Sequence, residues 1–179
     1  MLARAAVLFE RLLEAILIFL MVALTAVVVV AVVFRMAGDS LVWYDEVASI
    51  MLAWVTYYGG ALAALKRGHI GFDGLVIALP PAWRGGFVIL AELCVFGFFL
   101  LLAWTGWVVI RVLEGDTLVS LPGVSVQFTQ SVIPVGASLF LLAEALSLPA
   151  HWRRVMAGVS HDELVAAEPG DPDSQERTP

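Results

Sequence analysis

Two glutamates, Glu92 and Glu144, interrupt the long apolar stretches of this 179-residue chain. A carboxyl group inside a bilayer is costly, and it either marks a proton or cation site or is compensated by a nearby charge. Each lies near one end of its stretch, within roughly 10 Å of the same expected membrane boundary at 1.5 Å per residue. A transport pathway needs charge near the midplane, which favours interfacial contact or pairing over an ion site. The nearby bases are Lys66, Arg67, Arg84 and Arg153.

The three histidines, His69, His151 and His161, all lie outside these stretches. A membrane cytochrome ligates haem with histidines inside its bundle, so a haem protein is not expected. A lone loop histidine such as His69 has no second metal ligand at useful spacing, which favours solvation or a hydrogen bond with Asp73. Serines and threonines near the stretches have no neighbouring base, so the sequence predicts neither an enzyme nor a cofactor or metal site.

The composition identifies the solvent in which these residues act. The chain is 61% hydrophobic and 15% charged, with a mean hydropathy of +0.93, whereas soluble domains are about 45–50% apolar and about 25% charged. This excludes a soluble enzyme, a disordered protein and a nucleic-acid binder. Four stretches are long enough to cross a bilayer as helices, at residues 15–34, 47–65, 87–110 and 128–148. We therefore expect an all-α integral membrane protein with four transmembrane helices.

Lysines and arginines set the expected topology, because short cytoplasmic loops carry an excess of both. With both chain ends in the cytoplasm, eight of the ten lie on that side, and only Arg35 and Arg111 lie outside. The chain then divides into a cytoplasmic segment 1–14, a membrane domain 15–148 and a cytoplasmic tail 149–179. The tail is acidic and aperiodic, and we expect it to be largely disordered.

The longest link between the expected spans is the cytoplasmic loop 66–86. Its apolar residues fall on roughly one helical face before the pair Pro80-Pro81. An amphipathic segment of this kind lies in the plane of the membrane surface. The loop therefore predicts a short interfacial helix between the second and third spans.

The outer link between the first two spans is compact and charged, and Trp43-Tyr44-Asp45-Glu46 leads directly into the second span. Acids at a helix N-terminus satisfy free amides and suit the helix dipole. A further role is an ion pair from Arg35 to Asp45 or Glu46, which would tie the two helices into a hairpin.

Small and aromatic residues mark a protein-facing side on the second span. Gly59 and Gly60 permit close approach of another helix, and Trp54 lies in the middle of the span. In the fourth span Pro134 removes one backbone hydrogen bond, so we expect a kink near its outer third.

The order of these features resembles the small four-helix membrane subunit (DctQ type) of TRAP transporters, the tripartite ATP-independent periplasmic carriers. The resemblance covers most of residues 8–148, with aspartate at position 45 where the family often has glutamate. The matching pieces are Phe34-Arg35, Trp43-x-Asp45-Glu46, Trp54 with Gly59-Gly60, Lys66-Arg67-Gly68-His69-Ile70 with Asp73, and Ile133-Pro134-Val135-Gly136.

The resemblance implies an accessory scaffold in a bacterial inner membrane, beside a large permease subunit that holds the substrate and sodium sites. It also implies a periplasmic binding protein that delivers an organic acid. Arg35, Trp43, Asp45 and Glu46 are then candidates for the outer hairpin, and His69 and Asp73 for the inner loop. The alternatives are a self-contained small oligomeric transporter or channel, and the small subunit of a tripartite tricarboxylate transporter.

Overall fold

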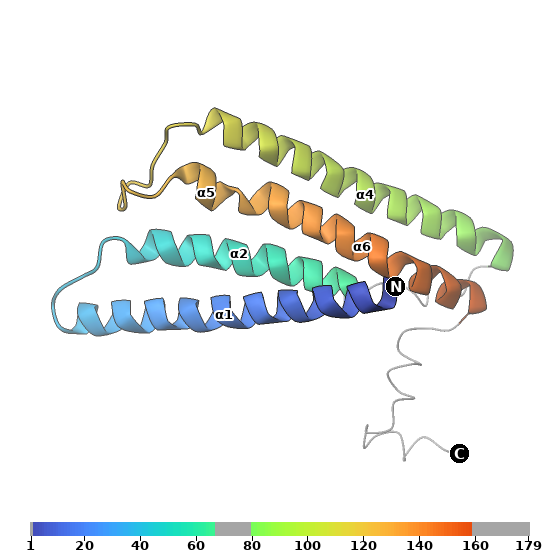
Figure 1. Ribbon diagram of the computed structural model, residues 1–179, viewed down its shortest axis with the longest axis horizontal. Coiled ribbons are helices and arrows are strands. Elements are labelled where there is room, and N and C mark those ends of the chain that lie inside the picture. Colours follow the sequence, from blue (N-terminus) through green and yellow to red (C-terminus); the bar gives the residue numbers. More distant parts are fainter. Residues whose placement is uncertain (1, 67–79, 159–179) are drawn as a thin grey trace, which may run out of the picture. The chain divides into compact units, whose positions relative to one another are not determined.

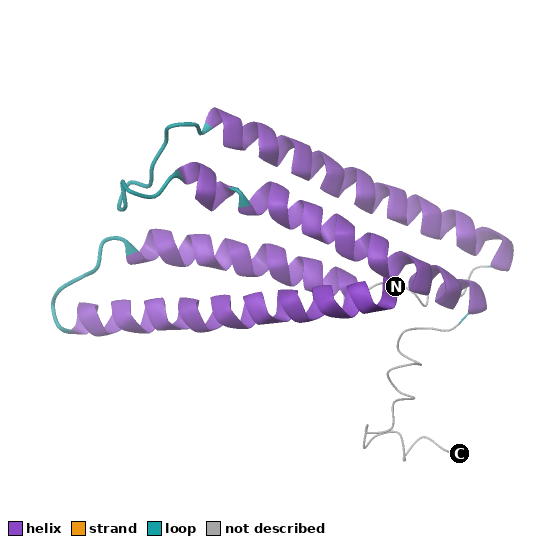
Figure 2. Ribbon diagram, in the orientation of Figure 1, coloured by secondary structure: helices purple, strands orange, loops and turns teal. Residues whose placement is uncertain are grey.

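A computed structural model describes residues 2–66 and 80–158, and the described chain is helical apart from its connecting loops (Figures 1 and 2). The helices are α1 (Leu2–Met36), α2 (Tyr44–Leu65), α4 (Pro81–Val112), α5 (Val126–Gln130) and α6 (Val132–Ala157). Four helical segments are long and apolar enough to cross a membrane, at Ala6–Met36, Tyr44–Leu65, Trp83–Val112 and Val126–Ala157. The all-α, four-span prediction is therefore confirmed.

The helices extend beyond the apolar stretches from which they were predicted. α1 begins at Leu2, so residues assigned to a cytoplasmic segment are already helical. α4 begins at Pro81, a residue suited to the first helical position because that position needs no amide donor. α6 continues through Pro149 to Ala157. Most of the expected interfacial helix falls on residues 67–79, outside the described part of the chain.

The chain forms two compact units. The first comprises residues 1–68 and 96–147, and therefore contains α1, α2, α5 and the adjoining parts of α4 and α6. The second comprises residues 69–95 and 148–179, of which the start of α4 and the end of α6 are described.

The core of the first unit lies along α6. Its buried residues include Val132, Ala137, Phe140, Ala143 and Ser147, which recur at intervals of three to five and so form one face of the helix. In contrast, α1 buries only Leu13 and Ala31 among its residues whose side chains are described. α6 is thus the central helix of this unit, while most of α1 remains available to lipid or to another protein.

Two glycines let neighbouring helices approach α6 and α4 closely. A Cβ atom at Gly136 would lie 2.6 Å from the Tyr57 Cβ atom on α2. A Cβ atom at Gly106 on α4 would lie 2.8 Å from Ile133 Cγ2 and 2.9 Å from Pro134 Cδ. The aromatic rings of Phe99 and Phe140 also stack, with centroids 3.6 Å apart and an 8° interplanar angle. Small residues therefore set the helix separations, as is common inside membranes.

The fourth apolar stretch is divided into two helices at Ser131. Pro134 has no N–H to donate to the Gln130 carbonyl, which a continuous helix would require. As the third residue of α6, Pro134 instead occupies a position where a missing donor costs little. Where the sequence predicts a kink, the structure has a break three residues before the proline.

The close approach at Gly136 predicts a specific sensitivity. Gly136→Ala should lower the free energy of unfolding by about 1–3 kcal/mol, because the added methyl group overlaps a Tyr57 atom close to the backbone. Thermal or denaturant unfolding of the purified chain in detergent measures this.

Gly60→Ala is the matched control, because no atom lies within 4 Å of a Cβ placed there. It should leave stability unchanged or raise it by about 0.5–1 kcal/mol through helix propensity. Equal destabilisation by the two substitutions would contradict the packing assigned to Gly136.

Candidate functional site

Glu46 lies in the first turn of α2 and binds the loop between α4 and α5. Its Oε1 accepts a hydrogen bond from the Val119 amide at 3.1 Å, and its Oε2 accepts one from the Ser120 amide at 2.9 Å. The Ser120 hydroxyl also donates to Oε2. A carboxylate that accepts several such bonds holds a loop more strongly than a neutral acceptor does. Glu46 therefore fixes a loop more than 70 residues away in sequence.

The loop that Glu46 holds has its own internal structure. Leu118 donates its amide to the Val124 carbonyl at 3.0 Å, and Val126 donates to the Asp116 carbonyl at 3.0 Å. Gly115 turns the chain with a φ of +91°, a conformation that glycine adopts readily. Ser125 then caps α5 by accepting the Gln127 amide at 3.2 Å. The loop is a short hairpin that presents Val119, which is 92% exposed.

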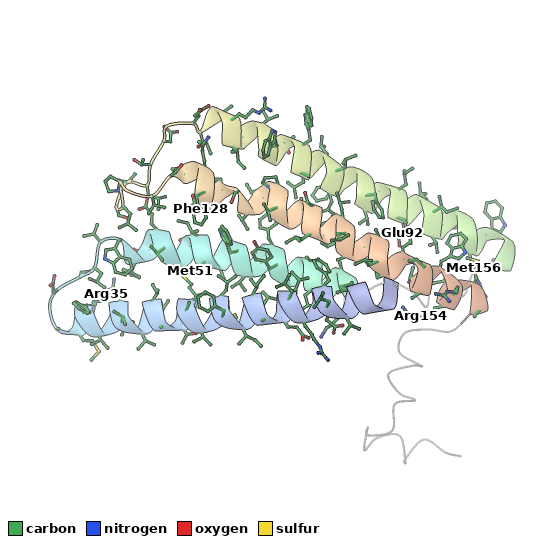
Figure 3. All side chains as sticks on the ribbon, in the orientation of Figure 1. Arg35, Met51, Glu92, Phe128, Arg154 and Met156 are labelled. Atoms are coloured by element: carbon green, nitrogen blue, oxygen red, sulfur yellow. The ribbon has the colours of Figure 1, made fainter. Side chains whose placement is uncertain are left out.

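The aromatic residues of α2 pack against α5. The Trp54 indole nitrogen donates to the Thr129 carbonyl at 3.3 Å. The Trp54 ring also lies beside those of Tyr58 and Phe128, with centroid separations of 5.8 and 5.6 Å; Phe128 is marked in Figure 3. α5 has lost its continuity with α6, and this bond gives its carbonyl end a partner. Trp54 faces protein, as its mid-span position indicates.

The described part of the outer hairpin does not contain the Arg35 ion pair that the sequence suggests. Arg35 is exposed in the last turn of α1, and Trp43 is the N-cap of α2 without a side-chain hydrogen bond. Within the described residues no ion pair joins Arg35 to Asp45 or Glu46. Glu46 is engaged by the α4–α5 loop, and Asp45 remains exposed. The acid in this first turn thus joins α2 to a different loop from the one that the sequence suggested.

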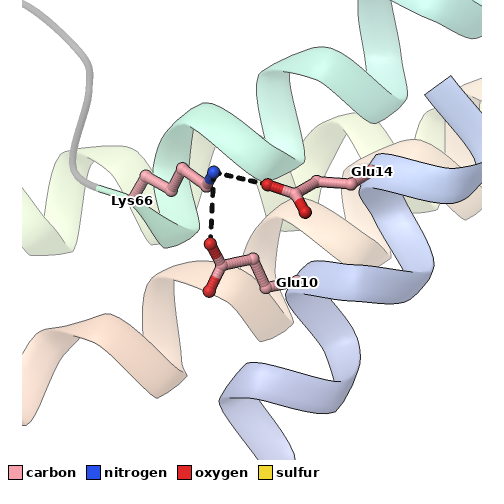
Figure 4. A network of polar contacts seen from close by, with 3 residues as sticks. All are labelled: Glu10, Glu14 and Lys66. Carbon is pink, nitrogen blue, oxygen red and sulfur yellow. Dashed lines mark hydrogen bonds and ion pairs between the residues drawn. The ribbon is translucent and has the colours of Figure 1, made fainter. Parts of the chain in front are cut away.

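The other end of the α1–α2 hairpin carries an ion cluster (Figure 4). Lys66 Nζ lies 2.6 Å from Glu14 Oε1 and 3.1 Å from Glu10 Oε1. Glu10 and Glu14 are one helical turn apart, so both reach the same ammonium group. The hydrogen bonds that Lys66 donates, first to Glu14 and then to Glu10, stabilise the ammonium and raise the pKa of Lys66 above its ordinary value. Lys66 therefore fixes the end of α2 against α1, although the cluster is exposed and screened by salt.

The remaining residues singled out from the sequence are Gly59, Gly60, Pro134, His69 and Asp73, and they lie in different environments. A Cβ atom at Gly59 would lie 3.9 Å from Leu17 Cδ2, so Gly59 faces α1, whereas nothing lies within 4 Å of the equivalent position at Gly60. Pro134 is buried in the first turn of α6, and its carbonyl accepts the Ser138 hydroxyl at 2.7 Å. His69 and Asp73 lie outside the described residues.

Glu144 is buried within α6 at 5% exposure, and Glu92 is half-buried in α4. The Ser147 hydroxyl donates to the Glu144 backbone carbonyl at 3.1 Å. Among residues 2–66 and 80–158, no group of three or more histidines, cysteines or acids is placed to hold a metal ion. Lys66, the single lysine of the sequence, is paired with α1 rather than with either of these glutamates.

Sequence reasoning missed the partners that give these residues their roles. Val119 and Ser120 belong to no motif, and Glu10 and Glu14 fall within the segment 1–14, to which the charge pattern assigns only a cytoplasmic position. Gln127 also joins two helices, because its side-chain nitrogen donates to the Ile110 carbonyl at the end of α4, at 3.0 Å. Only the i, i+4 spacing of Glu10 and Glu14 could have indicated a shared cation.

The arrangement defines a membrane helix bundle whose described polar contacts join its own loops and helix ends. Residues 24–154 match the family model of the DctQ component of the tripartite ATP-independent periplasmic transporters. A search of the curated proteins found no match. The chain belongs to the DctQ family, the small permease component of TRAP transporters.

The contact between Glu46 and the loop predicts a local change in dynamics. Glu46→Ala removes the acceptor for the Val119 and Ser120 amides, so their hydrogen exchange should accelerate by about tenfold or more. Hydrogen-exchange mass spectrometry of peptides covering residues 113–125 measures this.

Asp45→Ala is the matched control for this experiment. Asp45 is the adjacent acid in the same helical turn, but it is exposed and its described contact is made by its backbone carbonyl, which accepts the Ser49 hydroxyl. Its removal should leave the loop's exchange unchanged. If both substitutions accelerate exchange equally, the net charge of the turn holds the loop and the specific contact does not.

Proposed function

We propose that this chain is a static scaffold subunit of a sodium-coupled TRAP transporter that imports an organic acid. The large permease subunit holds the substrate and sodium sites, and a periplasmic solute-binding protein delivers the substrate. The present chain supplies membrane-embedded mass and surface to the large subunit. Family membership supports the class of system, and the distribution of contacts within the chain supports the mechanical role.

The observation that supports the mechanical role is that the described charged residues restrain loops and helix ends, whereas the apolar faces of two helices are exposed. Among the described residues, Glu46 makes two backbone contacts with the α4–α5 loop, and Lys66 pairs with two glutamates of α1. Such contacts restrain loops and helix ends. They do not line a path for ions, which would require charges near the midplane that are free to bind and release them.

α1 and α4 supply the surface that a scaffold needs. Large apolar side chains are exposed along both helices, among them Ile18, Phe19 and Val22 on α1 and Leu93, Leu100 and Leu101 on α4. In a bilayer such surface meets lipid or another membrane protein, and packing drives the choice between them. We assign one of these faces to the large subunit and the other to lipid.

The proposed topology places both chain ends in the cytoplasm of a bacterium, with the protein in the inner membrane. The outer hairpin with Arg35, Trp43, Asp45 and Glu46 then faces the periplasm, together with the α4–α5 loop. These segments are placed to contact the binding protein, and His69 and Asp73 are placed on the cytoplasmic side. The family match favours this system over the tricarboxylate-type alternative that the four-span architecture left open.

Reconstitution in vesicles tests the proposal. Vesicles that contain this chain alone should show no sodium- or proton-driven uptake of organic acids. Uptake should appear when the large subunit and the binding protein are present, and it should fall at least several-fold when this chain is omitted. Robust flux through this chain alone would instead establish a self-contained transporter and overturn the scaffold role.

A further inference from the structure

α1 carries a continuous apolar stripe on the side that faces away from α2. Leu13 is buried and Leu17 lies against Gly59 of α2, so these two residues mark the inward side of α1. At 3.6 residues per turn, the opposite side carries residues that recur alternately at four and three positions. The large members of this α1 stripe are between 55% and 72% exposed: Leu8, Leu12, Phe19, Val22, Val29 and Val33. The exposed Ala15 and Ala26 complete the spacing, which is that of a helix packed along another helix.

The α1 stripe is longer than the layer that lipid acyl chains can cover. Glu14 pairs with Lys66 near one end of α1, and Arg35 is exposed at the other end. These two residues are 21 positions apart, or about 32 Å at 1.5 Å per residue, which matches the hydrocarbon core of roughly 30 Å. Leu8 and Leu12 lie beyond Glu14, at the level of the ion cluster in Figure 4. Apolar side chains exposed at that level are better covered by protein than by lipid.

Arg11 adds one positive charge to the edge of the α1 stripe. It follows Leu8 by three positions and precedes Ala15 by four, so it lies on the same side of the helix. Glu10 and Glu14 are engaged by Lys66, and within residues 2–66 and 80–158 no ion pair joins Arg11 to an acid. A partner that covers this end of the stripe therefore meets an exposed cation, which an acidic side chain would complement.

The exposed face of α4 is of a different kind. Trp83, near the start of α4, is 65% exposed, and Trp104, towards its other end, is 69% exposed. They are 21 positions apart, close to the roughly 20 residues with which a helix crosses the hydrocarbon core. Tryptophan favours the headgroup level on either side of a bilayer. α1 contains neither tryptophan nor tyrosine, so the α4 face is suited to lipid and the α1 stripe is suited to protein.

We propose that the α1 stripe packs against a transmembrane helix of the large permease subunit, while the exposed face of α4 meets lipid. The partner helix is apolar across the bilayer, continues past it beside Leu8 and Leu12, and carries an acid near Arg11. Helices associate inside membranes through close packing, which the small side chains of Ala15 and Ala26 permit. This assignment rests on the proposed scaffold role and identifies the surface through which the chain braces its partner.

Photocrosslinking in the assembled transporter tests the assignment. Phe19 on α1 and Phe98 on α4 are a matched pair, because they are phenylalanines with 70% and 60% exposure. Each is replaced in turn by p-benzoylphenylalanine. The probe in place of Phe19 should crosslink to the large subunit, whereas the probe in place of Phe98 should label lipid. A probe in place of Leu8 should also crosslink to the large subunit, because acyl chains do not reach that level.

Charge reversal at Arg11 gives a second measurement. Arg11→Glu should lower the crosslink yield from Leu8 several-fold and lower the amount of large subunit that co-purifies, because it places two acids together. Arg11→Lys keeps the charge and should retain both. Arg111→Glu is the matched control, because Arg111 is an exposed arginine of α4. It should leave both readouts unchanged.

Co-purification separates failure of this assignment from failure of the scaffold role. If the large subunit co-purifies but Phe98 crosslinks to it at equal or greater yield than Phe19, the assignment is wrong and the scaffold role stands. The same conclusion follows if Phe19 crosslinks only to a second copy of this chain or not at all, or if Arg11→Glu and Arg111→Glu act equally. If the large subunit does not co-purify with the unmodified chain, both proposals fail.

Discussion

The close approach of α6 to its neighbours is the constraint on which the first unit depends. Inside a bilayer no hydrophobic force draws apolar helices together, so association relies on packing and on a few polar contacts. Gly136 against Tyr57 and Gly106 against Ile133 and Pro134 bring α2 and α4 within reach of α6. The contacts of Trp54 with α5 and of Gln127 with α4 join helices that these glycines bring close together.

Polar contacts then fix the ends of the packed helices. Glu46 holds the α4–α5 loop, Trp54 holds the carbonyl end of α5, and Lys66 holds the N-terminal part of α1. Each joins segments that are distant in sequence, and each lies at a helix end or at a helix break. The ends are restrained while the apolar faces of α1 and α4 remain exposed. A bundle of this kind is suited to staying fixed while a neighbouring subunit moves.

The sequence predicts the architecture well because apolar length reports directly on the bilayer. The four spans, the family and the protein-facing position of Trp54 all follow from composition, order and position. Pair contacts do not follow, because they depend on which helices become neighbours. Arg35 is close to Glu46 in sequence and carries the opposite charge. Glu46 nevertheless binds Ser120, which the packing of the helices brings into reach. Residues Glu10 and Glu14 acquire a role only because α1 continues helically beyond its apolar stretch.

The central claim is that this chain stays rigid while the transporter works. Spin labels at exposed positions Leu52 on α2 and Leu100 on α4, both in the first unit, would report its internal distances in a Cys94→Ser background. Double electron–electron resonance on the assembled transporter measures this distance with and without sodium and organic acid. A rigid chain should give one distance distribution that is unchanged by substrate. A substrate-dependent shift between two distances within this chain would contradict it.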